Sequence, residues 1–400
     1  MPAMRNTKTL KAGFLALASA GTVCAMAFAQ DWGGAAQAPV PGLTRAPVVK
    51  TNTQFAVATV ASGLDHPWGL RFLPDGRMIV TERVGRLRLV TADGKLSPPV
   101  AGVPKVLADS GQAGLFDVAL DSQFAQNHTL YLAYFERRSG GGQGLSVARA
   151  RLEDGASPHL EDVKVIFRAE PDNGPAINLG GRLLVAKDGT LFVTVGDRFT
   201  QRDKAQDLSA DNGKIVHINT DGSIPRDNPF VTRKGARGEI WSLGHRNPQG
   251  LTFSEDGTLW NVEHGAKGGD EINLIKPGKN YGWPIITYGV DYSGKKIGTG
   301  TSKPGMEQPV YYWDPSIAPS GMVFYSGDLF PQWKGNLFVG ALKFKRVRRL
   351  VMSGDKVVGE ETLLPNLDER IRDIRQGPDG AIYILTDNEK GRILKLVPKR

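Results

Sequence analysis

The sequence contains a single cysteine, Cys24, among 400 residues. It lies in an N-terminal segment that we expect to be removed on export, which would leave the mature chain without cysteine. Such a chain forms no disulfide, has no thiol nucleophile and offers no thiolate to a metal. The six histidines are scattered without ligand spacing. Together these absences argue against a zinc site.

Two further absences limit the partners. No long run of Lys and Arg is interleaved with aromatic residues, which argues against nucleic-acid binding. No second apolar stretch reaches the length of a membrane span, so we expect no integral span after the N-terminal segment is removed. Loss of three basic residues would lower Lys plus Arg from 50 to 47 against 41 acidic residues, a net charge of about +6. This excess favours either an anionic ligand or solubility.

Residues 1–29 have the pattern of an export signal. Three basic residues precede an apolar stretch from 12 to 28, and Ala27-Phe28-Ala29 offers a cleavage site that would leave Gln30 as the N-terminus. This pattern predicts a periplasmic or secreted protein. An uncleaved membrane anchor is the main alternative, although glycine and alanine dilute the apolar stretch. A lipid anchor on Cys24 is a weaker one, because its preceding residues are a poor lipidation context.

The remaining chain divides into a linker and a folded body. Residues 30–55 are rich in Ala, Pro, Gly and Thr without apolar periodicity, which predicts a flexible linker. From residue 56 to 400 the chain reads as short strand-like runs separated by turns, and glycine is abundant at 49 residues.

A repeat runs through this body: an Asp-Gly turn followed by an alternating apolar strand. Complete copies occupy residues 73–82, 186–194, 254–262 and 377–386, and degenerate copies occupy residues 126–132 and 334–340. The six turns, from Gly76 to Gly380, span 304 residues in five intervals, a mean of about 61. This spacing predicts an all-β fold, a six-bladed β-propeller of four-stranded antiparallel blades. A pair of β-sandwiches with similar turns is the alternative.

Three polar stretches depart from the strand pattern: residues 239–251, residues 263–284, and Lys343 together with residues 370–375. Strand alternation puts Arg370 and Arg372 on the same face. With Arg246 and Lys343 they would form a cationic site for a ligand that carries several carboxylates or phosphates. For any one of these cations taken alone, a solvated surface position or a salt bridge is the favoured explanation, so the prediction rests on their joint occurrence.

The stretch at 263–273 also indicates calcium. Asp270 and Glu271 supply hard oxygen ligands, and the glycine-rich run at 265–269 can turn carbonyl groups inward. An acidic surface turn is the alternative.

Several motifs, in order along residues 56–400, resemble the soluble PQQ-dependent aldose sugar dehydrogenases of the glucose/sorbosone dehydrogenase family. They comprise residues 63–70, 111–115, 243–250, 269–273, 280–284 and 370–373. The resemblance implies a calcium-containing six-bladed propeller, in agreement with the repeat. It also implies an oxidoreductase that passes hydride from the C1 hydroxyl of an aldose to pyrroloquinoline quinone (PQQ), yields a lactone, and delivers electrons to a periplasmic acceptor, as a monomer or homodimer.

The resemblance assigns site residues position by position. It implies that the cofactor contacts Gln112, Arg246, Asn247, Tyr292, Lys343, Arg370 and Arg372. One calcium would be held by Glu271 and the carbonyl of Tyr281, and a second by the carbonyls of Gly265 and Ala266. Arg246, Lys343 and calcium would stabilise negative charge that develops on the quinone.

One catalytic position departs from the family pattern. The family's general base is a histidine just before a Gly-Gly-Arg-like segment, and here Asn178 occupies that place. An amide has no useful basicity, and loss of a general base costs about 10²–10⁴-fold in rate. Another group such as Asp172 or Asp117 could substitute, the register could differ, or the chain could be a weakened propeller that binds sugar, PQQ or calcium as a recognition module. A calcium-dependent lactonase is a third possibility, and it predicts lactone hydrolysis without PQQ.

Overall fold

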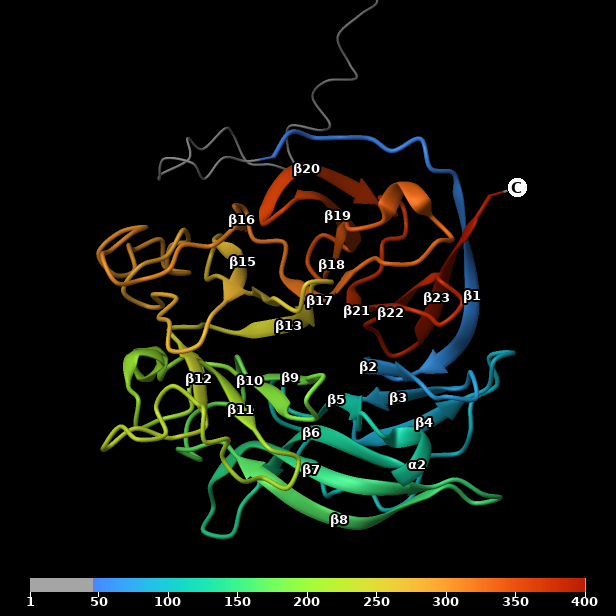
Figure 1. The fold of residues 1–400 in the computed structure, drawn as a ribbon, viewed down its shortest axis with the longest axis horizontal. Coiled ribbons are helices and arrows are strands. Elements are labelled where there is room, and N and C mark those ends of the chain that lie inside the picture. The colour runs from blue at the N-terminus through green and yellow to red at the C-terminus, as the bar shows by residue number, and fades with distance from the viewer. Residues whose placement is uncertain (1–45, 400) are drawn as a thin grey trace, which may run out of the picture. The chain divides into compact units, whose positions relative to one another are not determined.

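The computed structural model describes residues 46–399, which form six antiparallel β-sheets around a central channel (Figure 1). This confirms the predicted six-bladed propeller. The predicted export signal, residues 1–29, lies outside the described residues. No helix in the described part is long and apolar enough to cross a membrane.

The strands follow one another from the channel outward in each blade. Blade 1 comprises β2 (Pro67–Phe72), β3 (Met78–Glu82) and β4 (Arg86–Val90); blade 2 comprises β5 (Leu115–Leu120), β6 (Thr129–Arg137), β7 (Gln143–Glu153) and β8 (His159–Arg168). Blade 3 comprises β9 (Gly180–Val185), β10 (Leu191–Val195), β11 (Lys214–Ile218) and β12 (Ile240–Leu243); blade 4 comprises β13 (Pro248–Phe253), β14 (Leu259–Glu263), β15 (Asp270–Ile275) and β16 (Tyr311–Trp313). Blade 5 comprises β17 (Pro319–Phe324), β18 (Leu337–Ala341), β19 (Arg346–Ser353) and β20 (Lys356–Leu363); blade 6 comprises β21 (Ile371–Gln376), β22 (Ile382–Thr386), β23 (Gly391–Pro398) and β1 (Phe55–Leu64). Three short helices, α2 (Phe124–Asn127), η1 (Arg202–Gln206) and η2 (Pro331–Trp333), lie in the connections.

Blade 1 is the exception to the four-stranded rule, with three named strands. Residues 96–100 take the outer position, because Ser97 and Val100 donate backbone hydrogen bonds of 2.8 Å to the carbonyls of Leu89 and Leu87 on β4. Blade 6 obtains its outermost strand from the other end of the sequence, where β1 pairs antiparallel with β23. The propeller is therefore closed by pairing of its N-terminal and C-terminal strands.

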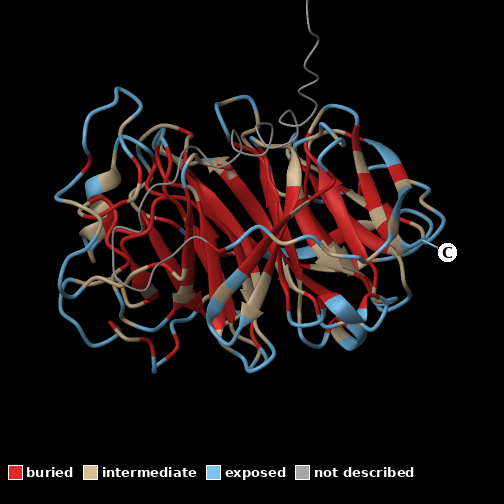
Figure 2. Ribbon diagram, turned by 90° about the horizontal axis from the view of Figure 1, so that it is seen from above, coloured by how far each residue is buried: buried red, intermediate tan, exposed pale blue. Residues whose placement is uncertain are grey.

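Each repeat forms the second strand of a blade and the turn before it. The turn glycines adopt positive φ, for example 86° at Gly76 and 75° at Gly380, which glycine accepts without steric cost. The strands that follow, such as β3, β14 and β22, are buried along their whole length because sheets pack on both faces (Figure 2). The Asp-Gly repeat therefore identifies the interior of each blade.

The described part of the predicted linker lies against blade 5. Ala46 is buried in its core, and residue 48 forms a parallel bridge with Glu360 on β20. The backbone N–H of Val49 donates to the carbonyl of Glu360 at 2.9 Å. Residues 46–49 thus follow the outer edge of this blade before β1 begins.

A buried ion cluster ties four blades together at the channel. The guanidinium of Arg182 on β9 lies 3.2 Å from Asp117 on β5 and 3.2 Å from Asp373 on β21, and its side chain is 1% exposed. Arg71 pairs with Asp117 at 3.0 Å and Arg375 with Asp373 at 3.0 Å. Arg182 also lies over the ring of Trp68, 4.4 Å from its centroid. The guanidinium of Arg182 thus lies between the two buried carboxylates and balances part of the charge of each.

Replacing that guanidinium is expected to destabilise the fold. Arg182→Met should lower the free energy of unfolding by about 3–5 kcal/mol, because Asp117 and Asp373 stay buried with less compensating charge. Urea denaturation followed by tryptophan fluorescence measures the loss. Arg226→Met, at an exposed position, is the matched control. An equal, small loss in both variants would show that the cluster does not stabilise the channel.

Candidate active site at one end of the channel

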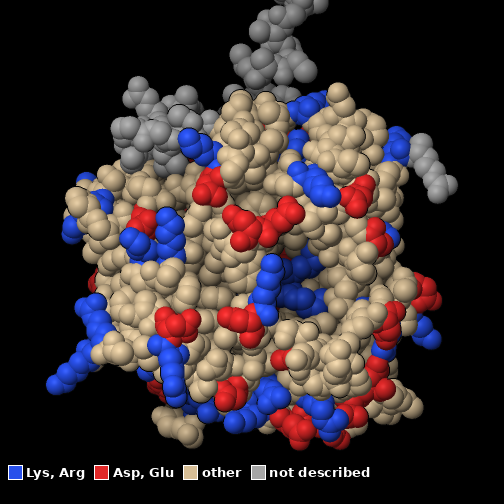
Figure 3. Space-filling model, in the orientation of Figure 1, with Lys and Arg blue, Asp and Glu red and all other residues tan. Residues whose placement is uncertain are grey.

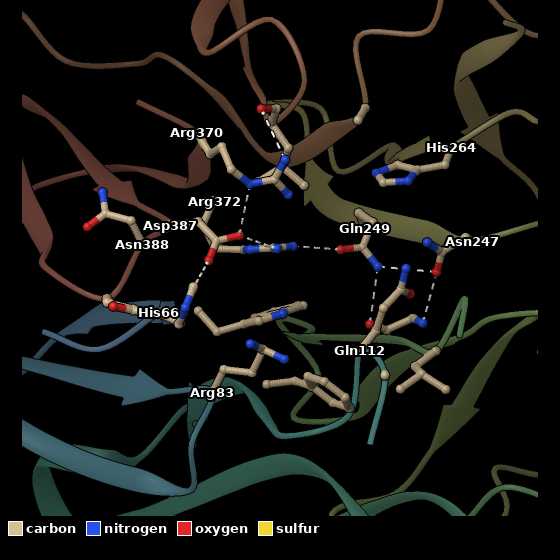
Figure 4. Close-up of a pocket in the computed structure, with 18 of the residues that line it drawn as sticks. His66, Arg83, Gln112, Asn247, Gln249, His264, Arg370, Arg372, Asp387 and Asn388 are labelled. Atoms are coloured by element: carbon tan, nitrogen blue, oxygen red, sulfur yellow. Dashed lines mark hydrogen bonds and ion pairs between the residues drawn. The ribbon is translucent and has the colours of Figure 1, made fainter. Parts of the chain in front are cut away.

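A large cavity of about 710 Å³ opens at the end of the channel where the innermost strands begin (Figure 4). All six blades contribute side chains at or just before these strand starts. They are His66 and Trp68, Gln112 and Phe116, Leu179 and Gly180, Asn247 and Gln249, Ala318, and Arg370 and Arg372. In every blade the pairing of the innermost strand with the next shifts register near this end. Such bulges redirect side chains at the rim of a closed sheet.

The predicted site residues gather around this cavity and two others that share His264 with it. Gln112, Asn247, Arg370 and Arg372 line the large cavity. Tyr292, Lys343, Gly265 and Ala266 line a second cavity of about 490 Å³, and Arg246, Glu271 and Tyr281 surround a small internal space together with Gly265. The four cations singled out in the sequence therefore belong to one region. Figure 3 shows Lys and Arg side chains gathered in the central hollow of this face.

Asp387, just after β22, fixes the cationic side of the large cavity. It accepts a 2.6 Å hydrogen bond from Arg372 and lies 3.7 Å from Arg370. Its other oxygen lies 2.9 Å from Nδ1 of His66, so this nitrogen carries a proton. Burial alone would raise the pKa of Asp387, but Arg372 and His66 hold it well below its usual range. Asp387 is therefore ionised and positions three residues that line the cavity.

Arg246 lies at the boundary between the cavities. Its guanidinium lies 5.4 Å from the ring centroid of Trp283 and 6.0 Å from that of Tyr292, within cation–π range. It donates a hydrogen bond to the carbonyl of Gly265. The backbone N–H of Arg246 donates to Glu263 at 2.7 Å. A cation is thus held beneath aromatic rings, one of them, Tyr292, 60% exposed.

Asn178, in the expected place of a base, is 4% exposed and does not line the large cavity. Its side-chain amide donates to Asp197 at 2.9 Å, and its backbone N–H donates to Gln112 at 2.8 Å. The second carboxylate oxygen of Asp197 accepts from Nε1 of Trp283 at 2.8 Å. Burial raises the pKa of Asp197, opposed by Arg246. The buried carboxylate of Asp197 could orient a histidine at position 178. In this chain it accepts instead from the amide of Asn178.

Neither aspartate considered as a substitute base lines the large cavity. Asp117 is fully buried, and although burial raises its pKa, Arg182, Arg71 and Arg375 hold that pKa below its usual value. Asp172 is partly buried and lies outside the residues that line the cavity. His264 does line it. Its Nε2 donates to the carbonyl of Pro319 at 2.6 Å, and burial lowers its pKa to about 3, so the ring is neutral at physiological pH.

Of the two acidic residues that the sequence suggested as calcium ligands, Asp270 is already fully engaged by the protein, whereas Glu271 is not. Both oxygens of Asp270 are already satisfied by Ser316 and by the backbone N–H groups of Gly265 and Ala318, so this carboxylate fixes the loop. Among residues 46–399, the side chain of Glu271 accepts a single hydrogen bond, a long one of 3.5 Å from the amide of Asn273. Burial and the neighbouring Glu263 raise the pKa of Glu271. No cluster of three or more His, Cys, Asp or Glu side chains suited to a metal occurs within residues 46–399.

Several residues of the site were absent from the sequence-based prediction: His66, Arg83, Gln249, His264 and Asp387 line the large cavity. One sequence signal could have located the buried carboxylates that hold some of these residues. In the four blades with complete Asp-Gly repeats, an acidic residue lies at the end of the strand after the turn or within two residues beyond it, namely Glu82, Asp197, Glu263 or Asp387. All four are buried.

A family model described as glucose/sorbosone dehydrogenase matches residues 64–395. The chain belongs to the glucose/sorbosone dehydrogenase family. Aldose sugar dehydrogenase YliI of Escherichia coli is 47% identical over 347 residues, which cover 86% of this chain and 93% of that protein. These matches agree with the resemblance found in the motifs.

Solved structures of the glucose/sorbosone dehydrogenase type share the architecture. The apo form of the soluble aldose sugar dehydrogenase from Escherichia coli has a TM-score of 0.83 and 46% identity, with 86% of this chain and all of that chain covered. The PQQ-bound aldose sugar dehydrogenase of Streptomyces coelicolor has a TM-score of 0.71 and 26% identity, with 87% of this chain and all of that chain covered.

The low pKa of His264 predicts an acid-dependent loss of stability. An unfolded histidine takes up a proton near pH 6.5, whereas the folded one does so only near pH 3, so this contribution is complete above pH 6.5 and declines as the pH falls. At pH 4.5 the loss should reach about 2–3 kcal/mol. Urea denaturation at pH 7.0 and 4.5, without added calcium, measures it. His264→Gln should show a correspondingly smaller decline, and an identical decline in both proteins would contradict the prediction.

Proposed function

We propose that this protein oxidises aldose sugars at C1 to lactones with PQQ and calcium as cofactors, and passes the electrons to a periplasmic acceptor. The main support is the large cavity, which is lined by Arg370 and Arg372 together with the amides of Gln112 and Asn247. The chain also belongs to the glucose/sorbosone dehydrogenase family. The periplasmic or secreted location predicted from residues 1–29 is part of the same proposal.

The large cavity fits an anionic ligand. PQQ carries three carboxylates, which need cationic and N–H partners when they leave water. Nε of Arg372 is buried without a hydrogen-bond partner in the described protein. Arg370 lines the cavity. Partial burial of its guanidinium and the nearby charge of Arg372 lower the pKa of Arg370. Binding a carboxylate would relieve both conditions. Arg370 and Arg372 would therefore hold the acid groups, with Gln112 and Asn247 as polar partners.

The small internal space fits a calcium ion. Glu271 and Glu263 are neighbouring carboxylates at this space, and burial together with Glu263 raises the pKa of Glu271. A hard cation would offset that repulsion, with carbonyl groups such as that of Tyr281 completing the ligand set. A metal at the carbonyl of Gly265 would have to displace the hydrogen bond from Arg246. Glu271 is therefore the side chain that would hold calcium.

The residues around Arg246 favour charge development on a bound carbonyl oxygen. PQQ would supply the hydride acceptor, and calcium would polarise it. Arg246 is a fixed cation with its backbone anchored on Glu263, which suits electrostatic stabilisation without reorganisation. Trp283 and Tyr292 cover this guanidinium and reduce its contact with water. Because Asn178 cannot take the substrate proton, proton removal is the step that this site supports least.

That weakness favours a second candidate, a propeller that binds sugar, PQQ or calcium as a recognition module. Its specific support is the amide of Asn178 in hydrogen-bond contact with Asp197. Cofactor binding is compatible with both candidates, whereas turnover separates them.

Reconstitution tests the proposed function directly. The metal-free, cofactor-free protein is titrated with PQQ and Ca²⁺, and the quinone absorbance spectrum and the melting temperature are followed. The proposal expects saturable binding, a raised melting temperature and dye reduction with at least one sugar of a broad aldose panel. Binding without dye reduction supports the recognition module. Absence of PQQ and Ca²⁺ binding defeats the dehydrogenase and leaves only a module that binds sugar.

Restoring a base at position 178 is expected to raise turnover. Asn178→His should increase kcat by roughly 10²–10⁴-fold if no other base acts, because Asp197 is placed to orient an imidazole. Steady-state dye reduction measures the gain, with Asn178→Gln as the matched control.

A second substitution checks the origin of that gain. Asp197→Asn in the Asn178→His background should remove most of it. A wild-type protein that turns over fast and is unaffected by Asn178→His would show that another group already serves as base.

A further inference from the structure

Arg83 is a cation that neither the motifs nor the family resemblance assigns. It follows β3 in blade 1, is partly buried, and lines the large cavity. Within the described chain its guanidinium has no carboxylate at ion-pair distance, and its only side-chain hydrogen bond is a long one of 3.5 Å to the carbonyl of Ala113. The adjacent Glu82 is engaged instead by Arg86 at 2.7 Å and Arg88 at 3.5 Å.

This lack of a counter-charge distinguishes Arg83 from the cations on blade 6. Arg370 and Arg372 share the carboxylate of Asp387, so part of their charge is neutralised within the protein. Lys390 also lines the cavity but is exposed. A partly buried guanidinium without a partner has a desolvation cost that an anion in the cavity would offset.

The backbone around Arg83 is fixed on both sides. Its N–H donates to the carbonyl of His66 at 3.0 Å, and its carbonyl accepts from Leu115 on blade 2 at 3.0 Å. Gly114 makes room for the side chain, because a Cβ at this glycine would lie 2.4 Å from Cγ of Arg83. The fold therefore directs this arginine into the cavity between blades 1 and 2.

Figure 4 shows where the guanidinium lies relative to the other cations. In that view Arg83 lies between His66 and Gln112, across the cavity from Arg370 and His264. The cavity is thus bordered by cations on two opposite sides. A ligand with acid groups at separate edges could be held from both.

We propose that Arg83 binds an anionic group, of the carboxylate class, on the ligand that occupies this cavity, opposite the side held by Arg370 and Arg372. The identity of that ligand as a quinone tricarboxylate rests on the proposed function. Arg83 is a binding residue in this account, and it takes no part in proton transfer.

Substitution of Arg83 tests the proposal by direct binding. Cofactor-free Arg83→Gln and Arg83→Lys are titrated with PQQ in the presence of Ca²⁺, and the quinone absorbance gives Kd. Arg83→Gln should weaken binding about ten- to a hundredfold, the range for one charge-assisted hydrogen bond, and Arg83→Lys should recover part of the loss. Kd for Arg83→Gln should also depend less steeply on salt, because one charge pair is missing. The control is Arg226→Gln, which removes one exposed arginine.

The outcomes separate this proposal from the proposed function. Equal Kd values for wild type and Arg83→Gln, with a lower melting temperature in the cofactor-free variant, would show a structural role and overturn the inference. If wild type does not bind PQQ, the proposed function fails and citrate becomes the probe. A citrate-induced rise in melting temperature that Arg83→Gln abolishes then supports the anion site, and its absence in wild type overturns the site as well.

Discussion

Four buried carboxylates hold the polar side chains at the cavity end of the propeller. Glu82, Asp197, Glu263 and Asp387 lie at the ends of second strands or within two residues beyond them, and burying each charge is costly unless it is fully paired. Glu82 is held by Arg86 and Arg88, whereas the partners of the other three lie at or beside the site. Asp387 takes His66 and Arg372, Glu263 takes His245 and the backbone of Arg246, and Asp197 takes Asn178 and Trp283. The same hydrogen bonds that offset burial therefore determine the geometry of the cavity.

The hydrogen bonds around position 178 can be made by side chains of different basicity. The carboxylate of Asp197 needs a donor, and the amide of Asn178 supplies one as well as an imidazole N–H would. The Asp197 contact to Trp283, and the hydrogen bond between Gln112 and residue 178, do not depend on a basic side chain. The framework around position 178 is thus compatible with either an amide or an imidazole there, since stability and proton transfer place different demands on that position.

The fold was predictable because its signal is repeated. Each copy of the turn and the strand after it indicates the same local structure, so four complete and two degenerate copies reinforce one another where a single copy would be ambiguous. The motif residues Arg370 and Arg372 face the cavity together, as strand alternation predicts. Arg83 and His66 were not predictable, because their role depends on which charges lie nearby in space. Asp270 shows the same limit: its composition suggested a metal ligand, and its hydrogen bonds to Ser316 and the loop backbone became visible only in the structure.

The pairing of β1 with β23 has a consequence for how the chain reaches its final form. Phe55 faces Pro398 and Leu64 faces Gly391, so the ring is completed by contacts separated by more than three hundred residues. Joining such distant segments carries a large loop-closure entropy and slows assembly. During synthesis the last blade remains incomplete until its C-terminal strand emerges. Until then β1 lacks its partner strand, and the ring stays open.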